Sequence, residues 1–401
     1  MYQYIERQAA LALPRLKELR MDLHRHPETA WNEIRTTKLI ADLLSKEGYD
    51  VVCGAAVAGH ETGVIATLHC GSQTGPVVAL RFDIDALPVK ESDAFDHLPF
   101  REGFASSHPG LMHACGHDGH TAIGIGCAIL LSRMKEKLNG TIKLIFQPAE
   151  EGARGALPIV KKGWLDDVDY FMAAHIFNMP PDFPTQYNII PGVSHSFATT
   201  KTDIIFHGKS AHAAHPSQGI DVIPAMANLI LRLNQIHGEG FIHTGTIQAG
   251  SGRNIIADYG KMELETRAPS TGQDHRLNAL LRESAEKIQK QYGVSVDLQV
   301  TGSAPSLESS PSLVSQITAL FETEVPGLHP WPHMTEFPAS EDAAHMINRV
   351  KERGGQALFM LFPASLAADL HHCDFDFPME LLSLGVTAFV SCIFFLLSKK
   401  S

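Results

Sequence analysis

Closely spaced cysteines are absent from this sequence. Its six cysteines are widely scattered along 401 residues, and no Cys-x-x-Cys pair occurs. Both a disulfide scaffold and a zinc finger need cysteines at short, regular spacings, so both kinds of protein are excluded. We therefore expect reduced thiols in a cytoplasmic protein. The cysteines are residues 53, 70, 115, 127, 373 and 392.

Positive charge is also scarce. Lysine and arginine number 33 against 44 aspartates and glutamates, which gives a formal net charge of −11. A general nucleic-acid binder carries a basic surface, and no basic run is present here. We predict no nucleic-acid partner and expect the chain to act on small molecules. Its length allows two domains, or one domain that carries a large insertion.

Long hydrophobic runs are missing from the N-terminal region. Residues 1–20 mix polar and apolar side chains, so we expect no signal peptide. Residues 381–397 form a nearly uncharged run of about 17 residues, which is the lower limit for a membrane-spanning helix. A buried core helix of an α/β protein would have the same composition. We expect the core helix and no membrane partner, and the spanning helix is the alternative.

Two kinds of apolar periodicity alternate along the first part of the chain. Residues 4–48 have the spacing of two amphipathic helices interrupted near Pro27, and residues 120–137 have that of a third helix. The apolar runs typical of buried strands are 63–68, 77–82, 140–146 and 168–174. Strands that alternate with helices predict an α/β fold with a mostly parallel sheet covered on both faces.

Polar residues follow three of these predicted strands. Asp83, Glu150 and His175 each come at or just after the end of an apolar run. In parallel α/β sheets the functional groups gather beyond the carboxyl ends of the strands. We therefore expect these three side chains to lie at the same edge of the sheet.

The pattern changes after about residue 190. Strands and helices then follow in the order β-α-β-β-α-β, which is typical of a ferredoxin-like unit of about 110 residues. The chain returns to α/β elements from about residue 310. We predict a discontinuous catalytic domain, residues 1–190 and 306–401, with an inserted α+β lid domain at residues 191–305.

A group of metal-binding residue types stands at the start of the third predicted helix. The chain has 22 histidines, and neutral imidazole is the commonest metal ligand in proteins. Cys115 and His117 lie two residues apart in a glycine-containing loop, and Cys, His and carboxylate suit zinc or a similar divalent ion. The alternative to a metal site is a buried cysteine that happens to lie near a histidine at a helix start. The additional histidines His113 and His120 make this alternative less favoured.

Adjacent carboxylates follow the predicted strand at 140–146. Glu150 and Glu151 point in different directions, so that one can bind a metal while the other accepts a proton from a water whose pKa the metal lowers. Asp85 has a similar placement, and its alternative is a capping residue in a turn. Alone, His175 is better explained as a core histidine than as a ligand. His371 and His372 become ligand candidates only because the other candidates do not complete the set of ligands that a metal site needs.

Together these segments resemble the amidohydrolase branch of the M20 metallopeptidase family. This branch contains bacterial aminoacylases, hippurate hydrolases, plant auxin-conjugate hydrolases and aminobenzoyl-glutamate hydrolases. The resemblance runs nearly end to end, and the Cys-Gly-His-Asp-Gly-His element is highly specific to this branch. The matching segments are 23–28, 80–88, 113–120, 146–152, 210–214, 340–342 and 371–377.

The resemblance implies a zinc-peptidase-like catalytic domain with two divalent metal ions. Manganese or zinc is expected, and nickel or cobalt is the alternative. Glu150 would be the general base. Asp85 would orient a metal ligand by contacting that ligand, without binding the metal itself. The implied ligands are Cys115, His117, Glu151, His175 and His371. Cys115 would bridge the two ions, and counting back from Phe375 favours His371 over its neighbour His372 as the last ligand.

The resemblance also assigns roles within the inserted domain. His212 would stabilise the oxyanion, often in the active site of the partner subunit of a homodimer that forms through this domain. Asn254 and Arg267 would hold the substrate carboxylate, which the Arg fork suits. Ala339 departs from the family pattern, because glycine usually precedes Ser-Glu-Asp.

The implied reaction is hydrolysis of an N-acyl or N-aroyl amino acid to a carboxylic acid and a free amino acid. The segment 340–377 is most similar to aminobenzoyl-glutamate hydrolases. A dipeptidase, a carboxypeptidase or an N-acetyl-amino-acid deacetylase of the same fold is the first alternative. A catalytically silent metal-binding protein is the second, and Glu150 argues against it.

Overall fold

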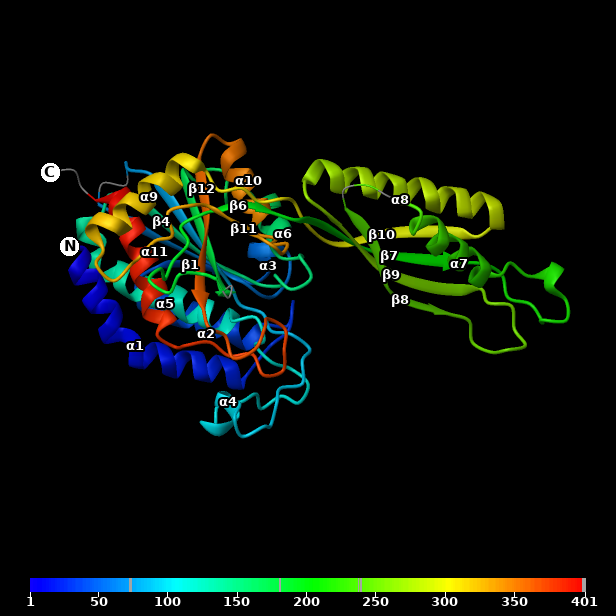
Figure 1. Cartoon of the computed structure of the whole chain (residues 1–401), viewed down its shortest axis with the longest axis horizontal. Helices are drawn as coiled ribbons and strands as arrows, with labels where there is room; N and C mark the ends of the chain where they lie inside the picture. The colour runs from blue at the N-terminus through cyan, green and yellow to red at the C-terminus, as the bar shows by residue number, and fades with distance from the viewer. Residues whose placement is uncertain (72–73, 180–181, 237, 239, 399–401) are drawn as a thin grey trace.

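Two separate sheets, each with its own helices, organise the chain into two domains (Figure 1). The computed structural model describes residues 1–398 except 72–73, 180–181, 237 and 239. The larger domain contains a six-stranded sheet, and the smaller contains a four-stranded sheet. The smaller domain projects from one side of the larger one (Figure 1). This is the mixed α/β, two-domain fold that the sequence predicts.

The six-stranded sheet has the order β1-β2-β4-β3-β5-β12. Strands β4, β3, β5 and β12 are parallel, whereas β2 is antiparallel to both of its neighbours. The carboxyl ends of the four parallel strands therefore meet at one edge. The strands are β1 (Asp50–Cys53), β2 (Val64–Cys70), β3 (Val77–Asp83), β4 (Gly140–Gln147), β5 (Tyr170–Asn178) and β12 (Gln356–Ala364).

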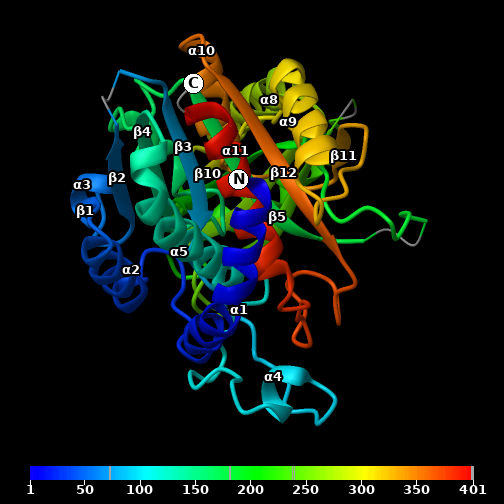
Figure 2. The same cartoon turned by 90° about the vertical axis from the view of Figure 1, so that its left-hand side faces the viewer.

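Helices cover both faces of this sheet. Helices α1 (Tyr2–Arg25), α2 (Ile34–Lys46), α5 (His117–Met134), α9 (Pro311–Glu324) and α11 (Leu381–Leu397) pack on one face. Figure 2 shows α1, α5 and α11 in front of the strands. Helices α3 (Ala55–Ala58), α6 (Ala156–Lys161) and α10 (Ala344–Glu352) pack on the other face. The short helix α4 (Leu98–Arg101) lies in an excursion beyond β3, and the 3-10 turn η1 (Lys135–Lys137) follows α5.

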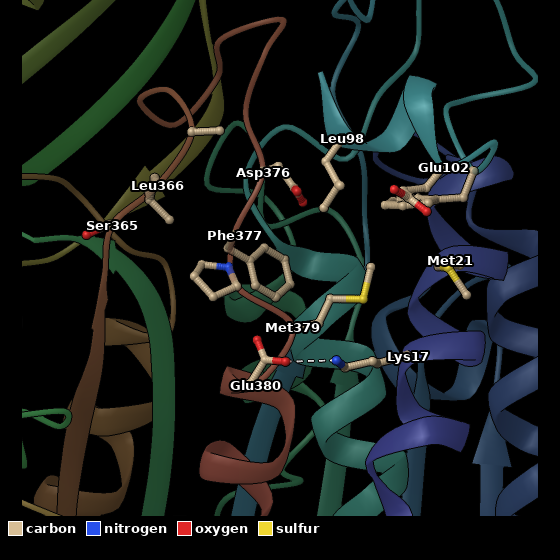
Figure 3. Close-up of a pocket in the computed structure, with 13 residues that line it drawn as sticks. Lys17, Met21, Leu98, Glu102, Ser365, Leu366, Asp376, Phe377, Met379 and Glu380 are labelled. Atoms are coloured by element: carbon tan, nitrogen blue, oxygen red, sulfur yellow. Dashed lines mark hydrogen bonds and ion pairs between the residues drawn. The ribbon is translucent and has the colours of Figure 1, made fainter. Parts of the chain in front are cut away.

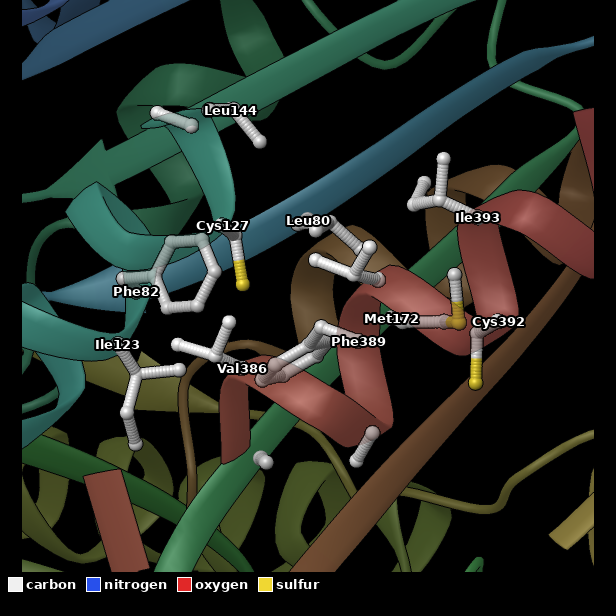
Figure 4. Packing of buried hydrophobic residues seen from close by; sticks show 14 of the residues in the cluster. Leu80, Phe82, Ile123, Cys127, Leu144, Met172, Val386, Phe389, Cys392 and Ile393 are labelled. Carbon is white, nitrogen blue, oxygen red and sulfur yellow. The ribbon is translucent and has the colours of Figure 1, made fainter. Parts of the chain in front are cut away.

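Strand β3 shows why both faces become buried. Successive side chains of a strand point to opposite faces, so Leu80 and Phe82 pack with α5 and α11, whereas Ala79 packs toward the α6 and α10 side. Figure 4 shows Phe82 and Leu80 with Ile123 of α5 and Phe389 of α11. The apolar run of β3 therefore fits a central strand and no edge strand.

Helix α11 is the nearly uncharged segment that the sequence left open between a core helix and a spanning helix. Most of its side chains are buried, and the ring of Phe389 lies 5.2 Å from that of Phe82 in an edge-to-face contact. Among the described residues, no helix combines the length and the apolar character that a membrane crossing requires. The prediction of a core helix is confirmed.

The smaller domain is an antiparallel sheet of order β10-β7-β9-β8 with two helices. The chain order β-α-β-β-α-β is as predicted, and the sheet order is that of a ferredoxin-like unit. Its elements are β7 (Ala198–His207), the 3-10 turn η2 (Pro216–Gln218), α7 (Val222–Leu233), β8 (Phe241–Ala249), β9 (Tyr259–Ala268), α8 (Thr271–Tyr292) and β10 (Ser295–Ala304).

A two-stranded sheet lies where the chain passes between the domains. Strand β6 (Val193–Ser196) pairs in parallel with β11 (Thr335–Phe337), and Val193 packs in the core of the larger domain. This pairing has no signal in the sequence, because both strands are very short. The boundaries 190/191 and 305/306 stay a prediction, and the structure adds that β6 packs with the larger domain.

One predicted strand end differs from the structure. Strand β5 continues to Asn178, so His175 lies inside the strand and not at its end. The parallel partner β12 extends equally far, and its residue Leu361 is opposite His175. The apolar residues Ile176 and Phe177 continue the strand beyond the histidine, which the sequence pattern did not take into account.

Loss of the Phe389 ring tests whether α11 is part of the core. Phe389→Ala should lower the free energy of unfolding of the larger domain by about 3–5 kcal/mol, because it leaves a cavity among Phe82, Phe362 and their neighbours. Phe395→Ala in the same helix is the matched control, since its side chain is 38% exposed. Urea denaturation measures both, and equal losses would contradict the packing described here.

Candidate active site

The loop before α5 positions Cys115 and His117. Gly116 has a positive φ of 85°, which turns the chain into the helix that begins at His117. A Cβ atom at Gly116 would lie 3.2 Å from Cδ1 of Ile176, so a larger residue would also crowd strand β5. Cys115 and His117 are both buried. The backbone conformation of this loop and the contact with Ile176 therefore explain the glycine at position 116.

Glu150 and Glu151 follow β4 in a strained turn. Ala149 has a φ of 52°, and its N–H donates to Oε1 of Glu33 at 2.8 Å. A positive φ at a non-glycine residue is uncommon and persists only where surrounding contacts hold it. The turn points the two successive N–H groups of Glu150 and Glu151 in one direction.

Asp85 receives both of these N–H groups. Its Oδ1 accepts from the Glu150 N–H at 3.1 Å, and its Oδ2 accepts from the Glu151 N–H at 3.0 Å. Its backbone carbonyl accepts from Nδ1 of His117 at 2.9 Å. Asp85 thus fixes the backbone of the Glu-Glu pair and the orientation of the His117 ring, which leaves Nε2 of His117 facing away from it.

The five predicted metal ligands form one connected group. Nε2 of His175 lies 3.5 Å from Sγ of Cys115, and Nε2 of His371 lies 3.4 Å from Oε1 of Glu151. Between these two pairs, ligand atoms of Cys115, His117 and Glu151 lie within 4.8 Å of one another. Residues from β5, the α5 loop, the turn after β4 and the segment before α11 therefore converge.

The backbone at His371 separates it from its neighbour His372. His371 has a φ of 68°, and its N–H donates to the carbonyl of Ala114 at 2.7 Å. Its side chain lines the cavity beside Glu151. His372 does not line this cavity, and its Nδ1 lies 3.6 Å from Oδ2 of Asp374. The side chain that reaches the group is that of His371.

The chemistry of this group fits divalent metal ions. Nε2 of His117 and Oε1 of Glu151 are buried and have no hydrogen-bond partner among the described residues. Burial and the nearby His120 lower the pKa of His175 to about 3, so its imidazole is neutral and able to act as a ligand. Thiol, imidazole and carboxylate donors together are typical of zinc and similar ions.

Glu150 lies in a different environment from Glu151. Carboxylate oxygens of Glu150, Glu341 and Asp342 lie within 4.8 Å of one another. Burial, Glu341 and Glu151 raise the pKa of Glu150 well above its usual range. For Glu151, burial is outweighed by His371 and His117, which lower its pKa. The surroundings therefore favour a proton on Glu150 and a charge on Glu151.

A buried arginine that sequence reasoning missed supports these acids. Nη1 of Arg81 lies 2.6 Å from Oδ2 of Asp83, and its Nη2 lies 2.9 Å from Oε1 of Glu341 and 3.2 Å from Oδ1 of Asp342. All four side chains are buried. The one available signal is an arginine inside the apolar run 77–82, where a charge needs partners.

His120 also differs from the ligand candidates. Its Nδ1 lies 2.6 Å from Oδ1 of Asp83, and its Nε2 accepts the N–H of Ile176 at 3.1 Å. Both ring nitrogens are therefore occupied. This histidine joins β3 to β5 beneath the group and offers no free nitrogen.

A second buried network ties α1 to the α5 loop. Nε of Arg20 lies 3.2 Å from Oδ2 of Asp118, and Nδ1 of His24 lies 2.8 Å from the same oxygen. The Arg20 guanidinium also pairs with Asp376 and stacks on the Phe377 ring at 3.8 Å. The matching segments around residues 23–28 and 371–377 thus meet at the metal-binding loop.

A cavity of about 270 Å³, called the polar cavity because Glu150, Arg267 and other charged side chains line it, opens from the group toward the smaller domain. Arg267 lines it, and Nε of Arg267 lies 2.9 Å from Oε1 of Glu265. Lys201 of β7 and Ser340 lie on the same wall. Sequence reasoning missed Lys201, which a lone lysine in an alternating strand does not reveal. Of the three predicted lid residues, Arg267 is the one at this cavity.

His212 and Asn254 lie elsewhere in the smaller domain. Both are exposed, and neither lines the polar cavity. They are close to each other, because the N–H of Ala213 donates to the carbonyl of Asn254 at 3.0 Å and His212 forms a bridge with Ile255. The single chain therefore does not bring these two residues to the site.

A further cavity, of about 560 Å³, lies between α1, α4 and the segment before α11. Figure 3 shows Met21, Leu366 and Phe377 around it and the ion pair of Lys17 with Glu380, 2.8 Å long, at one end. None of the predicted metal ligands lines it.

The model of peptidase family M20/M25/M40 matches residues 79–394. The chain belongs to this family. It is 37% identical over 414 residues to a p-aminobenzoyl-glutamate hydrolase polypeptide of Escherichia coli, covering 93% of this chain and 94% of the relative. It is also 37% identical to indole-3-acetyl-aspartic acid hydrolase of Enterobacter agglomerans, covering 93% and 94%. A dinuclear metal-binding M20 peptidase of Bacillus subtilis has a TM-score of 0.71 at 30% identity, covering 96% of this chain and 99% of that one.

Membership of the M20/M25/M40 family gives the site its chemical class. The two hydrolases match nearly end to end, and the ligand-type side chains converge in the matched region. The chain is a metal-dependent amidohydrolase. The residues that hold the metal and their individual roles remain our assignment.

Replacing Asp85 tests the link between the Glu-Glu turn and the metal ligands. Asp85→Asn leaves one acceptor oxygen for two N–H groups, so the turn that carries Glu151 loses its fixed orientation, whereas the backbone carbonyl that holds His117 is unchanged. We expect metal affinity to fall by about 10–100-fold. Competition with a chromophoric chelator measures it, with exposed Asp96→Asn as the control. Equal affinities in the two variants would contradict this role.

Proposed function

We propose that this chain hydrolyses the amide bond of N-acyl or N-aroyl amino acids with two divalent metal ions. The observation that carries the proposal is that Glu151 shares a group of ligand atoms with Cys115 and His117, while its neighbour Glu150 lies beside Glu341 and Asp342. A site that cleaves an amide needs both a proton carrier and metal ligands, and these adjacent residues supply one of each.

The ligands in this proposal are the five connected side chains. Bound ions would polarise the scissile carbonyl and make a water more acidic. The mixed Cys, His and Glu set supports manganese or zinc, and nickel and cobalt remain possible occupants. The match to a dinuclear metal-binding peptidase supports two ions. The ligands are Cys115, His117, Glu151, His175 and His371.

Glu150 would move the proton in two steps. The positive charge of bound metal ions would favour the carboxylate form of Glu150, which first accepts a proton from the attacking water and then donates it to the nitrogen of the leaving amine. The acids Glu341 and Asp342 beside it disfavour a permanent charge on Glu150, so the proton can be both held and released there. Asp85 keeps Glu150 and Glu151 in their separate orientations.

Arg267 would hold the carboxylate of the amino-acid half of the substrate. It lines the cavity beside Glu150, and its planar fork suits a carboxylate. The names of the two relatives support an aromatic acyl group joined to an acidic amino acid. A dipeptidase, carboxypeptidase or deacetylase of the same fold is the alternative, which an N-acyl panel assayed against dipeptides separates.

A homodimer through the smaller domain would complete the site. Strand β8 is the edge of its sheet, and an exposed edge is a template for pairing with another chain. Apolar side chains are exposed on and beside it, including Leu231, Phe241 and Ile247. His212 and Asn254 lie outside the cavity of their own chain, so we assign both to the partner's site. The inserted domain, residues 191–305, would be both lid and dimer interface in this proposal. The cytoplasmic location of the protein stays a prediction.

Glu150→Gln tests the proton carrier. The amide cannot accept the proton from water, so kcat for N-benzoyl-glutamate should fall by about 10²–10⁴-fold while the metal content, measured by elemental analysis, stays the same. Glu18→Gln on the exposed face of α1 is the control. An unchanged kcat in the Glu150 variant would contradict this mechanism.

Mixing two inactive variants tests whether His212 acts in the partner's site. Removing an oxyanion donor costs about 10²–10³-fold in kcat, so His212→Ala should be nearly inactive alone. Random mixing with Glu150→Gln should restore activity to about one quarter, because each mixed dimer has one intact site. If His212 acts within its own chain, mixing restores nothing, and that result would overturn the assignment.

A further inference from the structure

Two cavities meet at the metal-binding group. The polar cavity of about 270 Å³ lies toward Arg267. A second cavity of about 600 Å³ lies on the other side, and Glu151, Gly152, Lys201 and His371 line both. The two proposed ligands Glu151 and His371 thus stand at the boundary between two chambers.

The second cavity has an apolar wall, formed by Ala30, Ala86, Leu87, Pro88 and Leu111, and the charged side chains of Arg154 and Lys201 also line this cavity. Backbone hydrogen bonds hold its three segments together. The Ala86 N–H donates to the carbonyl of Glu28 at 2.8 Å, and Leu87 and Met112 exchange two hydrogen bonds of 3.0 Å. The wall is therefore a built surface rather than a set of loose side chains.

The apolar wall is continuous with the catalytic residues. Ala86 directly follows Asp85, and Leu111 precedes Cys115 by four residues. The same backbone segments thus carry the wall and the metal-binding group, so a shift in one would move the other. A group that rests on the wall is held in a fixed position relative to the scissile bond.

The position of Glu150 decides which half of the substrate enters each cavity. Glu150 lines the polar cavity and does not line the second one. It must reach the leaving nitrogen, so the amino-acid half belongs in the polar cavity with Arg267. The acyl half is bonded to the same carbonyl and leaves in the opposite direction, into the second cavity.

We propose that the apolar wall is the acyl-binding surface and that it selects aromatic acyl groups over small ones. This inference rests on the proposed function. An acetyl group would cover little of the wall, whereas a planar ring can cover Leu87 and Leu111 together and remove their apolar surface from water. Lys201 at the shared rim leaves the outer part of the cavity open to polar ring substituents.

Binding without turnover tests the apolar wall directly. In metal-loaded Glu150→Gln protein, calorimetry gives the Kd values of N-benzoyl-glutamate and N-acetyl-glutamate. We expect the benzoyl compound to bind about tenfold or more tightly, a ratio that Leu111→Arg should reduce about fivefold or more. Leu111→Ala should reduce it about threefold and decides the matter if the arginine variant does not fold. Leu11→Arg, 65% exposed on α1, is the matched control.

Equal losses for both ligands, or a ratio that Leu111 does not affect, would overturn the acyl assignment. The proposed function is tested separately, by measuring hydrolysis by the unsubstituted enzyme. Hydrolysis with a ratio independent of Leu111 refutes the apolar wall alone. A wall-dependent ratio without any hydrolysis refutes the proposed function alone.

Discussion

The carboxylate of Asp85 accepts two successive backbone N–H groups, and the rest of the site depends on this pair of hydrogen bonds. They hold the backbone from which Glu150 and Glu151 reach different neighbours, although the two residues are adjacent in the chain. The backbone carbonyl of Asp85 orients His117 at the same time. The end of β3, the turn after β4 and the start of α5 are therefore tied together at one residue. The apolar wall follows from it directly, because Ala86 and Leu87 are the next two residues.

Buried charge is the cost of this arrangement. Arg81 forms ion pairs with Asp83, Glu341 and Asp342 beneath the site, and Arg20 forms ion pairs with Asp118 and Asp376 beside it. Such networks contribute little net stability, and breaking one by removing a single partner costs several kcal/mol. Their value here is positional, since they join β3 to the segment at 341–342 and α1 to the loop at 115–120. Glu341 and Asp342, the acids beside Glu150, belong to the Arg81 network. The same side chains therefore join distant segments and influence the protonation of Glu150.

The sequence predicted most of the fold, because apolar periodicity is local. It predicted the parallel sheet, the ferredoxin-like insert and the core helix at 381–397. It could not predict the pairing of β6 with β11, which depends on two very short strands far apart in the chain, or the continuation of β5 past His175. The site residues came from the family resemblance together with strand ends. The roles of Arg81, His120 and Lys201 depend on contacts between distant segments, so residue spacing did not predict their partners.

The central claim is that five side chains from four segments hold two metal ions beside Glu150. Anomalous diffraction from crystals of the manganese-loaded or zinc-loaded protein measures this most directly. The account predicts two peaks about 3.5–4 Å apart, enclosed by Cys115, His117, Glu151, His175 and His371. A single peak, or peaks confined to His372, Cys373 and Asp374, would contradict it.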